Sequence, residues 1–402
     1  MFKGALPGFR DFYPQELAER AYIMDVWRSV ARRYAFVEYD GPPLEPLDLY
    51  TRKSGEEIVG QLYNFVDKGG RDVALRPEMT PTVARMVGAR ANALRKPVRW
   101  FSMPQLFRYE RQQKGRLREH YQLNVDIFGS AEVAGDAELV ACAVDIMRGF
   151  GLTSDDVVVR VSDRRILQAF LESLAVPAAA IDTVYAIIDK LDRTPPEVSA
   201  EKLAALGLSE DATVRIVAIA SVSMDDVKER LAGSEAALHA EEFERYLVYV
   251  ATLLGGDASW LKLDLSIVRG LAYYTGIVFE LFDRSGEFRA ICGGGRYDAL
   301  LKSLGGADLP AVGFGMGDVV LGELLRAKGL LRASSTAADY WLAADESMPL
   351  EIVMAEAATR RASGHSVEYS LRPQTMSKQK KAALASGARE FISLTHDDAS
   401  NG

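Results

Sequence analysis

A run of cations in residues 107–129, FRYERQQKGRLREHYQLNVDIFG, is the first feature of this sequence with residue types suited to chemistry. Guanidinium groups bind phosphate oxygens in a forked geometry and keep their charge when they are removed from water. Carboxylates beside them can hold an amine, so the stretch fits a site for an amino acid and a nucleotide. The alternative interpretation is a solvated, charged hairpin. The charged residues are Arg108, Glu110, Arg111, Lys114, Arg116, Arg118, Glu119 and Asp126.

Two other segments supply groups that match such a site. LRPEMT places Glu78 and Thr80 at a predicted strand-to-helix junction, where an ammonium group can bind. Thr80 followed by proline is also the pattern of a helix N-cap. LSIVRGLAYYTGIVFE contains a single arginine, Arg269, with no carboxylate close to it in sequence. A buried arginine is costly without an anionic partner, so this position favours contact with an anionic ligand.

Tyrosines and glycines follow Arg269 along the chain. Tyr273 and Tyr274 either line a ligand pocket or pack as a core pair. AICGGGRYDALL predicts a strand, a glycine turn and the start of a helix, and AVGFGMGDVVLGELL repeats that form. Because Gly293 to Gly295 have no side chains, the backbone there can approach a ligand closely. The alternative is a plain tight turn.

The elements that would position these residues follow from the spacing of apolar side chains. Helical spacing predicts amphipathic helices over residues 15–34 and 136–150. Strand patterns on either side of a polar turn predict hairpins in 107–129 and in LYNFVDKGGRDVAL. In FVEYDGPPLEP, the pair Pro42 and Pro43 cannot lie inside a strand ladder, which predicts an edge or interface segment.

The texture of the sequence divides the chain into parts. Alanine-rich, acidic helical patterns predict an inserted helical domain over residues 165–258. It interrupts a larger domain that would comprise residues 1–164 and 259–331. After a linker of small residues at 332–338, strands and helices alternate as βαβαβ, which predicts a small α/β domain over 339–402.

Composition excludes several classes of protein. The chain has 402 residues and is 48% hydrophobic, enough for a large core in two or three domains. No apolar run has the length of a membrane span, and the N-terminus lacks the apolar stretch of a signal peptide. The four histidines are scattered and the two cysteines are far apart, so we expect no metal site and a cytoplasmic, reducing compartment.

Together these motifs resemble class II aminoacyl-tRNA synthetases, and within that class the histidyl-tRNA synthetases. FRYERQQKGRLREHYQ resembles motif 2, EYDGPPLEP resembles motif 1, and GFGMGDVVL stands where motif 3 belongs. VRGLAYYTG and GGGRYD resemble the two histidine-specific motifs. The resemblance implies an α+β fold: an antiparallel sheet flanked by helices, with an inserted helical domain. The small C-terminal α/β domain resembles the family's anticodon-binding domain, apparently truncated. Motif 1 implies a homodimer.

The resemblance also implies a reaction and roles for the residues. Histidine and ATP would form histidyl-adenylate, with Mg²⁺ on the outer phosphates, and the histidyl group would pass to the 3′ end of tRNA(His). Arg108 and Arg269 would contact the α-phosphate and act as the catalytic residues. The remaining implied ATP-binding residues are Glu110, at the adenine amine, and Arg116, at the outer phosphates. The implied histidine-binding residues are Glu78, Thr80 and Gln122 at the α-ammonium, and Asp126, Tyr273 and Tyr274 around the imidazole.

Four departures from the family pattern leave a second function open. Asp126 stands where a glutamate is usual, Ala272 replaces an aspartate, and the chain stops at Gly402. Val320 occupies the position of the motif 3 arginine. Arg296 either replaces that arginine at ATP or pairs with Asp298 or another carboxylate. The alternative function is a non-catalytic, histidine-sensing regulatory subunit of ATP phosphoribosyltransferase, but such a sensor needs no arginines at the α-phosphate.

Overall fold

The computed structural model describes residues 4–51, 59–110, 115–269, 273–333 and 337–395. Arg111, Lys114 and Ala272 lie outside the described residues. The chain divides into two compact units: Met1–Phe12 with Arg20–Arg332, and Tyr13–Glu19 with Ala333–Gly402. Within the described part of the chain, no helix has the length and apolar character needed to cross a bilayer.

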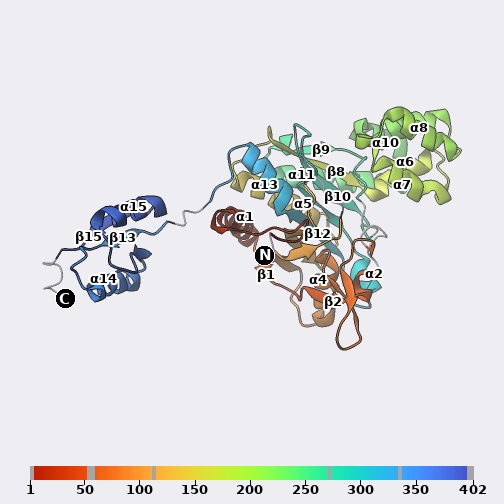
Figure 1. Cartoon of the computed structure of the whole chain (residues 1–402). Coiled ribbons are helices and arrows are strands. Elements are labelled where there is room, and N and C mark those ends of the chain that lie inside the picture. The colour runs from red at the N-terminus through yellow and green to blue at the C-terminus, as the bar shows by residue number, and fades with distance from the viewer. Residues whose placement is uncertain (1–3, 52–58, 111–114, 270–272, 334–336, 396–402) are drawn as a thin grey trace. The chain divides into compact units, whose positions relative to one another are not determined.

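A nine-stranded sheet forms the centre of the large unit, in the order β1-β5-β7-β12-β11-β10-β8-β9 with β6 paired to β7 (Figure 1). Its neighbouring strands run antiparallel except for the pairs β1–β5 and β8–β9. The strands are β1 (Val37–Glu38), β5 (Val98–Ser102), β6 (Gln105–Phe107), β7 (Glu119–Phe128), β8 (Val157–Asp163), β9 (Leu261–Leu263), β10 (Ile277–Asp283), β11 (Cys292–Arg296) and β12 (Ala311–Gly317). The predicted antiparallel pairing around the charged turn is confirmed by β6 and β7.

Strand β7 shows how the sequence assigns one face of this sheet to the core. Successive side chains of a strand point to opposite faces. Leu123, Val125 and Ile127 belong to the main hydrophobic core, together with residues of α5 (Ala134–Gly149) and α13 (Asp318–Ala327). The alternating positions Gln122 and Asp126 therefore face away from that core. Helices cover one face of β7, and the polar face is left for a site.

The glycine triplet lies inside a strand, which corrects the predicted turn. Gly293, Gly294 and Gly295 are the middle of β11 and pair with both β10 and β12. A Cβ at Gly294 would lie 2.5 Å from Cβ of Phe314 and would also meet the backbone of β12. Close packing within the sheet therefore requires glycine there, because no larger residue fits against the neighbouring strand.

A second sheet of three short strands, in the order β2-β4-β3, carries the segment around Glu78. Its strands are β2 (Leu44–Pro46), β3 (Asn64–Val66) and β4 (Asp72–Leu75), and the predicted hairpin is confirmed by the antiparallel pair β3–β4. Helix α4 (Thr80–Arg90) begins at Thr80, and its N-cap is Met79, which makes no capping hydrogen bond through its side chain. The prediction of Thr80 as the N-cap is wrong by one residue.

Only helices occupy the segment between β8 and β9. The α-helices there are α6 (Arg164–Ser173), α7 (Ile181–Ile188), α8 (Pro196–Ala205), α9 (Glu210–Val217), α10 (Met224–Leu231) and α11 (Ala237–Leu253). The green part of Figure 1 shows α6, α7, α8 and α10 grouped together. The predicted helical character of residues 165–258 is confirmed, whereas their status as a separate domain stays a prediction.

In the small unit, the predicted βαβαβ pattern is confirmed. Its elements are β13 (Tyr340–Ala343), α14 (Leu350–Ala362), β14 (Val367–Tyr369), α15 (Met376–Ser386) and β15 (Glu390–Ser393). All strands run parallel in the order β14-β13-β15. Leu342 of β13 packs with residues of α14, while Trp341 and Ala343 pack with Ala383 of α15. The helices thus cover opposite faces of the sheet, as alternation along β13 requires.

Candidate active site

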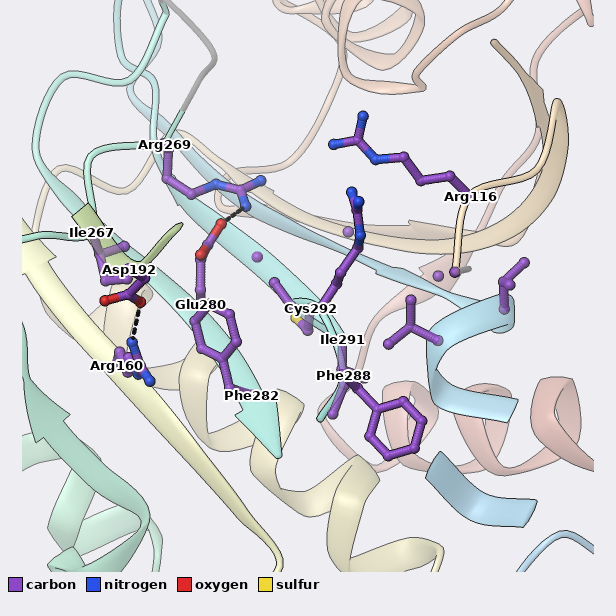
Figure 2. A pocket seen from close by; sticks show the side chains of 18 of the residues that line it. Arg116, Arg160, Asp192, Ile267, Arg269, Glu280, Phe282, Phe288, Ile291 and Cys292 are labelled. Carbon is purple, nitrogen blue, oxygen red and sulfur yellow. Dashed lines mark hydrogen bonds and ion pairs between the residues drawn. The ribbon is translucent and has the colours of Figure 1, made fainter. Parts of the chain in front are cut away.

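A cavity of about 670 Å³ opens on the large unit, and arginines from separate segments line it. Arg108 follows β6, Arg116 precedes β7, and Arg269 follows β9. Figure 2 shows the guanidinium groups of Arg116 and Arg269 extending into the same space from opposite sides. Because like charges repel, cations gathered on one concave wall favour an anionic ligand.

The arginines of the segment that resembles motif 2 are held in different ways. Arg108 donates from Nε to the carbonyl of Pro77 at 2.9 Å, which fixes its stem beside the segment of Glu78. Arg116 pairs with Glu110 at 2.9 Å between Nη1 and Oε2. Arg118 is different, because its guanidinium lies 4.1 Å from the ring centroid of Tyr109 and does not line the cavity. Only part of the charged run therefore faces the site.

Arg269 has an unusual backbone and an incomplete set of partners. Its φ of +62° is in the left-handed region, which a residue with a side chain adopts at a cost. Its guanidinium pairs with Glu280 of β10, so an anionic partner exists eleven residues away in sequence. Its Nε has no hydrogen-bond partner among the described residues. Burial lowers the pKa of Arg269, but Tyr274 and Glu280 outweigh it and raise the pKa, so the group stays charged.

His120 adds a neutral polar group to the cavity. It lies on β7, lines the cavity, and interacts with Arg108 and Gln122. Burial, and then the charge of Arg108, lower the pKa of His120 to about 3. The ring therefore adds no positive charge at neutral pH. Sequence reasoning missed this residue, because a single histidine in a charged hairpin carries no signal of its own.

A second cluster, formed by carboxyl groups and tyrosines, lies next to the cavity. Tyr273 donates to Glu78 at 2.9 Å, and its ring centroid is 5.8 Å from that of Tyr297. Tyr297 in turn donates to Asp126. Tyr274 stacks near Tyr273, with ring centroids 5.1 Å apart. The cluster joins four of the segments singled out in the sequence into one buried chain of polar and aromatic groups.

Asp126 is a buried carboxyl group of this cluster. Burial raises the pKa of Asp126 to about 7, although the hydrogen bond from Tyr297 acts to lower it. Its Oδ2 has no hydrogen-bond partner among the described residues. A buried carboxylate oxygen without a donor is costly, and it marks a place where a ligand N–H would be favourable. Sequence reasoning missed Tyr297, although it lies within the quoted GGGRYD.

The predicted residues thus fall into a cavity set and a cluster set. The cavity lining contains Arg108, Glu110, Arg116, Gln122 and Arg269. The adjacent cluster contains Glu78, Tyr273, Tyr274 and Asp126, with Thr80 at the start of α4 hydrogen-bonded to Tyr273. The sets meet where the guanidinium of Arg269 lies 5.8 Å from the ring centroid of Tyr274.

Arg296 does not join either set, which corrects its predicted role at ATP. It is 5% exposed and does not line the cavity. Its guanidinium pairs with both carboxylate oxygens of Asp136 on α5 and with Asp298. It also donates to the carbonyls of Ser130 and Glu132, at 2.9 and 3.2 Å. Every nitrogen is occupied, so Arg296 has no donor left for a nucleotide.

Val320, at the position of the motif 3 arginine, does line the cavity. It lies on the first turn of α13, after β12. A Cβ placed on Gly115 would be 3.4 Å from Cγ2 of Val320, so the valine faces the residue just before Arg116. The position therefore faces the site, and its side chain brings no charge there.

Glycines of β11 and β12 lie directly against polar side chains of the site. An added Cβ on certain glycines of β11 and β12 would overlap a side chain that crosses the sheet. These pairs are Gly293 with Arg269, Gly313 with Asp126 and Gly315 with Gln122. The glycines therefore leave room for the site residues to lie across neighbouring strands.

This arrangement can bind a polyanion among the arginines and a small amine-bearing or heterocyclic group among the tyrosines and carboxyl groups. Such a geometry brings a carboxylate of the second ligand toward a phosphate of the first. Among the described residues, no group of three or more histidine, cysteine or acidic side chains could hold a metal ion.

Comparisons with known proteins agree with this geometry. The sequence model described as histidyl-tRNA synthetase matches residues 8–317. The histidine--tRNA ligase of Opitutus terrae is 44% identical over 96% of this chain and 89% of its own length. A crystal structure of histidyl-tRNA synthetase from Nostoc sp. PCC 7120 superposes with a TM-score of 0.84 at 26% identity, covering 100% of this chain and 93% of that one.

Another solved structure bears on the alternative function. An ATP phosphoribosyltransferase regulatory subunit/histidyl-tRNA synthetase from Bacillus halodurans superposes with a TM-score of 0.80, covering 98% of each chain. Its identity to this chain is 22%, so the likeness shows a shared fold and carries no evidence about activity.

Proposed function

Because the chain belongs to the histidyl-tRNA synthetase family, we propose residue roles for the reaction of a histidine--tRNA ligase. The protein is such an enzyme: it activates histidine with ATP and transfers it to tRNA(His). In the first step the carboxylate of histidine attacks the α-phosphorus, and the bond to the β-phosphate breaks. Pyrophosphate leaves. In the second step a ribose hydroxyl at the 3′ end of the tRNA attacks the histidyl carbonyl, and AMP leaves.

The convergence of Arg108, Arg116 and Arg269 on one cavity carries this proposal. Arg108 and Arg269 contact the α-phosphate and stabilise the charge that develops on its oxygens in the transition state. Arg116 binds the outer phosphates, and Glu110 accepts from the adenine amine. Mg²⁺ enters with ATP as part of that substrate. Glu110 and Glu280 are each already paired with an arginine, which is consistent with a metal held mainly by phosphate oxygens.

Histidine occupies the cluster beside the arginines. Glu78, Thr80 and Gln122 hold its α-ammonium. Asp126 accepts from an imidazole N–H through the oxygen that lacks a protein donor. Tyr273 and Tyr274 enclose the ring. This places the histidine carboxylate next to Arg269, which touches both the cavity and Tyr274.

Histidine-dependent exchange of pyrophosphate into ATP tests these roles. Arg108→Ala should lower the exchange rate by about a hundredfold or more, because a contact made in the transition state is lost. Arg99→Ala is the matched control. Arg99 lies on β5, where its Nη1 pairs with Oε2 of Glu138 at 3.2 Å, and it does not line the cavity. An Arg108→Ala enzyme as active as Arg99→Ala would remove Arg108 from the α-phosphate.

The remaining assignments concern partners and place. We propose a homodimer through the segment that resembles motif 1, where Val37 of β1 and Leu44 of β2 are exposed. A cytoplasmic location is consistent with the two cysteines, both free and buried. Sedimentation would test the dimer.

We assign anticodon binding to the small unit on the exposed lysines of α15, which are Lys378, Lys380 and Lys381. Phosphate contacts of this kind supply much of the affinity for nucleic acid. Replacing these lysines by glutamate should raise KM for tRNA and leave pyrophosphate exchange unchanged. A change in exchange without a change in KM for tRNA would contradict this assignment.

A further inference from the structure

Arg289, a cation in addition to Arg116, faces the same corner of the cavity as Val320. Arg289 lines the cavity and comes from the turn between β10 and β11. A Cβ placed on Gly115 would be 3.4 Å from Cγ2 of Val320 and 3.9 Å from Cδ of Arg289. The two side chains therefore flank the backbone just before Arg116. A guanidinium that starts at this Cδ lies next to the space that an arginine at position 320 would enter.

The turn that carries Arg289 is held firmly on both sides. The buried carboxylate of Asp283 accepts from the backbone N–H groups of Glu287 and Phe288, each at 3.0 Å. Phe288 packs against the main core. The N–H of Ile291 donates to the carbonyl of Leu281 at 2.8 Å. Arg289 thus extends from a short span between two anchored residues, so its stem has a fixed origin although its side chain is exposed.

The charges around Arg289 favour an anion. Burial, and then the charges of Arg116 and Arg193, lower the pKa of Arg289, while Glu110 acts in the opposite direction. Arg116 and Arg193 also line the cavity. Three like charges around one corner repel one another, and a phosphate oxygen placed among them removes that repulsion. Cations gathered in this way on one cavity wall favour a phosphate.

We infer that Arg289 takes over the contact with ATP that position 320 no longer makes. It binds the outer phosphates of ATP together with Arg116. This inference rests on the proposed placement of ATP among Arg108, Arg116 and Arg269. The positive charge comes from the turn between β10 and β11 instead of from helix α13, but it reaches the same corner of the site.

Steady-state pyrophosphate exchange with MgATP tests this inference. Arg289→Ala should raise KM for ATP about tenfold, the effect of losing one charge-assisted hydrogen bond. KM for histidine should stay within about twofold of its original value. Arg284→Ala is the matched control: Arg284 lies on the same turn, does not line the cavity, and donates to the backbone carbonyl of Ser259 at 2.5 Å. It should leave KM for ATP unchanged.

A second variant separates ligand binding from a structural role. Val320→Arg, introduced into Arg289→Ala, should restore most of the lost affinity for ATP, because it returns a cation to the same corner from α13. A structural defect at the turn would not be rescued from another element. The inference is overturned if Arg289→Ala leaves KM for ATP unchanged or lowers it. It is also overturned if KM for ATP is as high in the double variant as in Arg289→Ala.

The result also separates this inference from the proposed function. If Arg108→Ala abolishes exchange while Arg289→Ala has no effect, the ATP site stands and only the role of Arg289 fails. If neither variant changes exchange, ATP does not bind among these arginines, and both proposals fail.

Discussion

Two arginines of the large unit show what separates a structural cation from a ligand-binding one. Arg296 at the end of β11 is 5% exposed and uses every nitrogen on protein acceptors, including Asp136 and two carbonyls. Arg269 has one carboxylate partner, Glu280, and an Nε without a partner among the described residues. It also has a strained backbone and lines the cavity.

The comparison teaches that burial alone does not identify a functional arginine. Both residues lie in apolar or glycine-rich sequence, and the sequence predicts a contact with ATP for both, with a carboxylate pair as the alternative for Arg296. What distinguishes them is whether the protein satisfies all the donors. A saturated guanidinium serves the fold, whereas an unsaturated one that faces a cavity has donors to offer a ligand.

The largest effect that this comparison predicts is on stability. Arg296→Ala should lower the free energy of unfolding by about 3–5 kcal/mol, because Asp136 is then buried without its partner. Burial already raises the pKa of Asp136 to about 6 in the presence of Arg296. Urea denaturation measures the loss. Adding Asp136→Asn to Arg296→Ala should recover part of it, and a loss below about 1 kcal/mol would break the comparison on its structural side.

Arg269→Ala should show the opposite behaviour. Its pyrophosphate exchange should fall by about a hundredfold or more, which corresponds to about 2.7 kcal/mol in the transition state. Its midpoint of urea denaturation should stay close to that of the unmodified protein, because Glu280 is partly exposed and can be solvated. If Arg269→Ala instead unfolds the protein and its folded fraction remains fully active, Arg269 and Arg296 belong to one class.

Asp126 extends the comparison to a carboxyl group. Its Oδ2 lacks a donor, so it should resemble Arg269 rather than Arg296. Asp126→Asn should weaken histidine binding about tenfold and leave ATP binding unchanged, because only an imidazole N–H needs that acceptor. Titration calorimetry with each ligand separately decides this. Equal losses for histidine and ATP would place Asp126 outside the histidine pocket.

The smallest predicted effect is a pH dependence of stability from the same residue. The pKa of Asp126 is about 7 in the folded protein and about 4 in an unfolded chain. The folded state holds its proton more tightly, so the stability from Asp126 is present below pH 4 and is lost as pH rises to 7. Asp126→Asn removes this term, so between pH 5 and 6 the variant should gain about 1 kcal/mol relative to the unmodified protein. Parallel urea curves at both pH values would contradict the shifted pKa.

How much of the site could be predicted from the sequence depended on the distance between partners along the chain. The hairpin of β6 and β7, the helix at Thr80 and the βαβαβ pattern depend on local spacing, and these predictions are confirmed to within a few residues. Arg296 pairs with Asp298, which is close enough in sequence to be predicted as a partner, and with Asp136, which lies far away in sequence on α5. No local pattern contains the pairing with Asp136, so the sequence could not separate Arg296 from Arg269.

The same limit explains the residues that were missed. Tyr297 reaches Asp126 only because β11 and β7 both pair with β12. Arg289 sits in the mixed run FDRSGEFRA, which reads as a solvated turn. Its relation to Val320 and Gly115 appears only when the strands are assembled. The glycine triplet predicts a turn from sequence, because glycine in a strand is unusual unless another group needs the space.

The glycines of β11 and β12 that lie against the site residues limit how this enzyme can be made more heat-resistant. Strand glycines are standard targets for substitution, since a larger residue restricts the unfolded chain and packs better. At Gly293, Gly313 and Gly315 such a substitution would push Arg269, Asp126 or Gln122 out of position, because the added Cβ would overlap these side chains. A substitution that raises stability at these glycines would therefore lower turnover. Laboratory evolution for thermal tolerance should find its solutions away from the middle of β11 and β12.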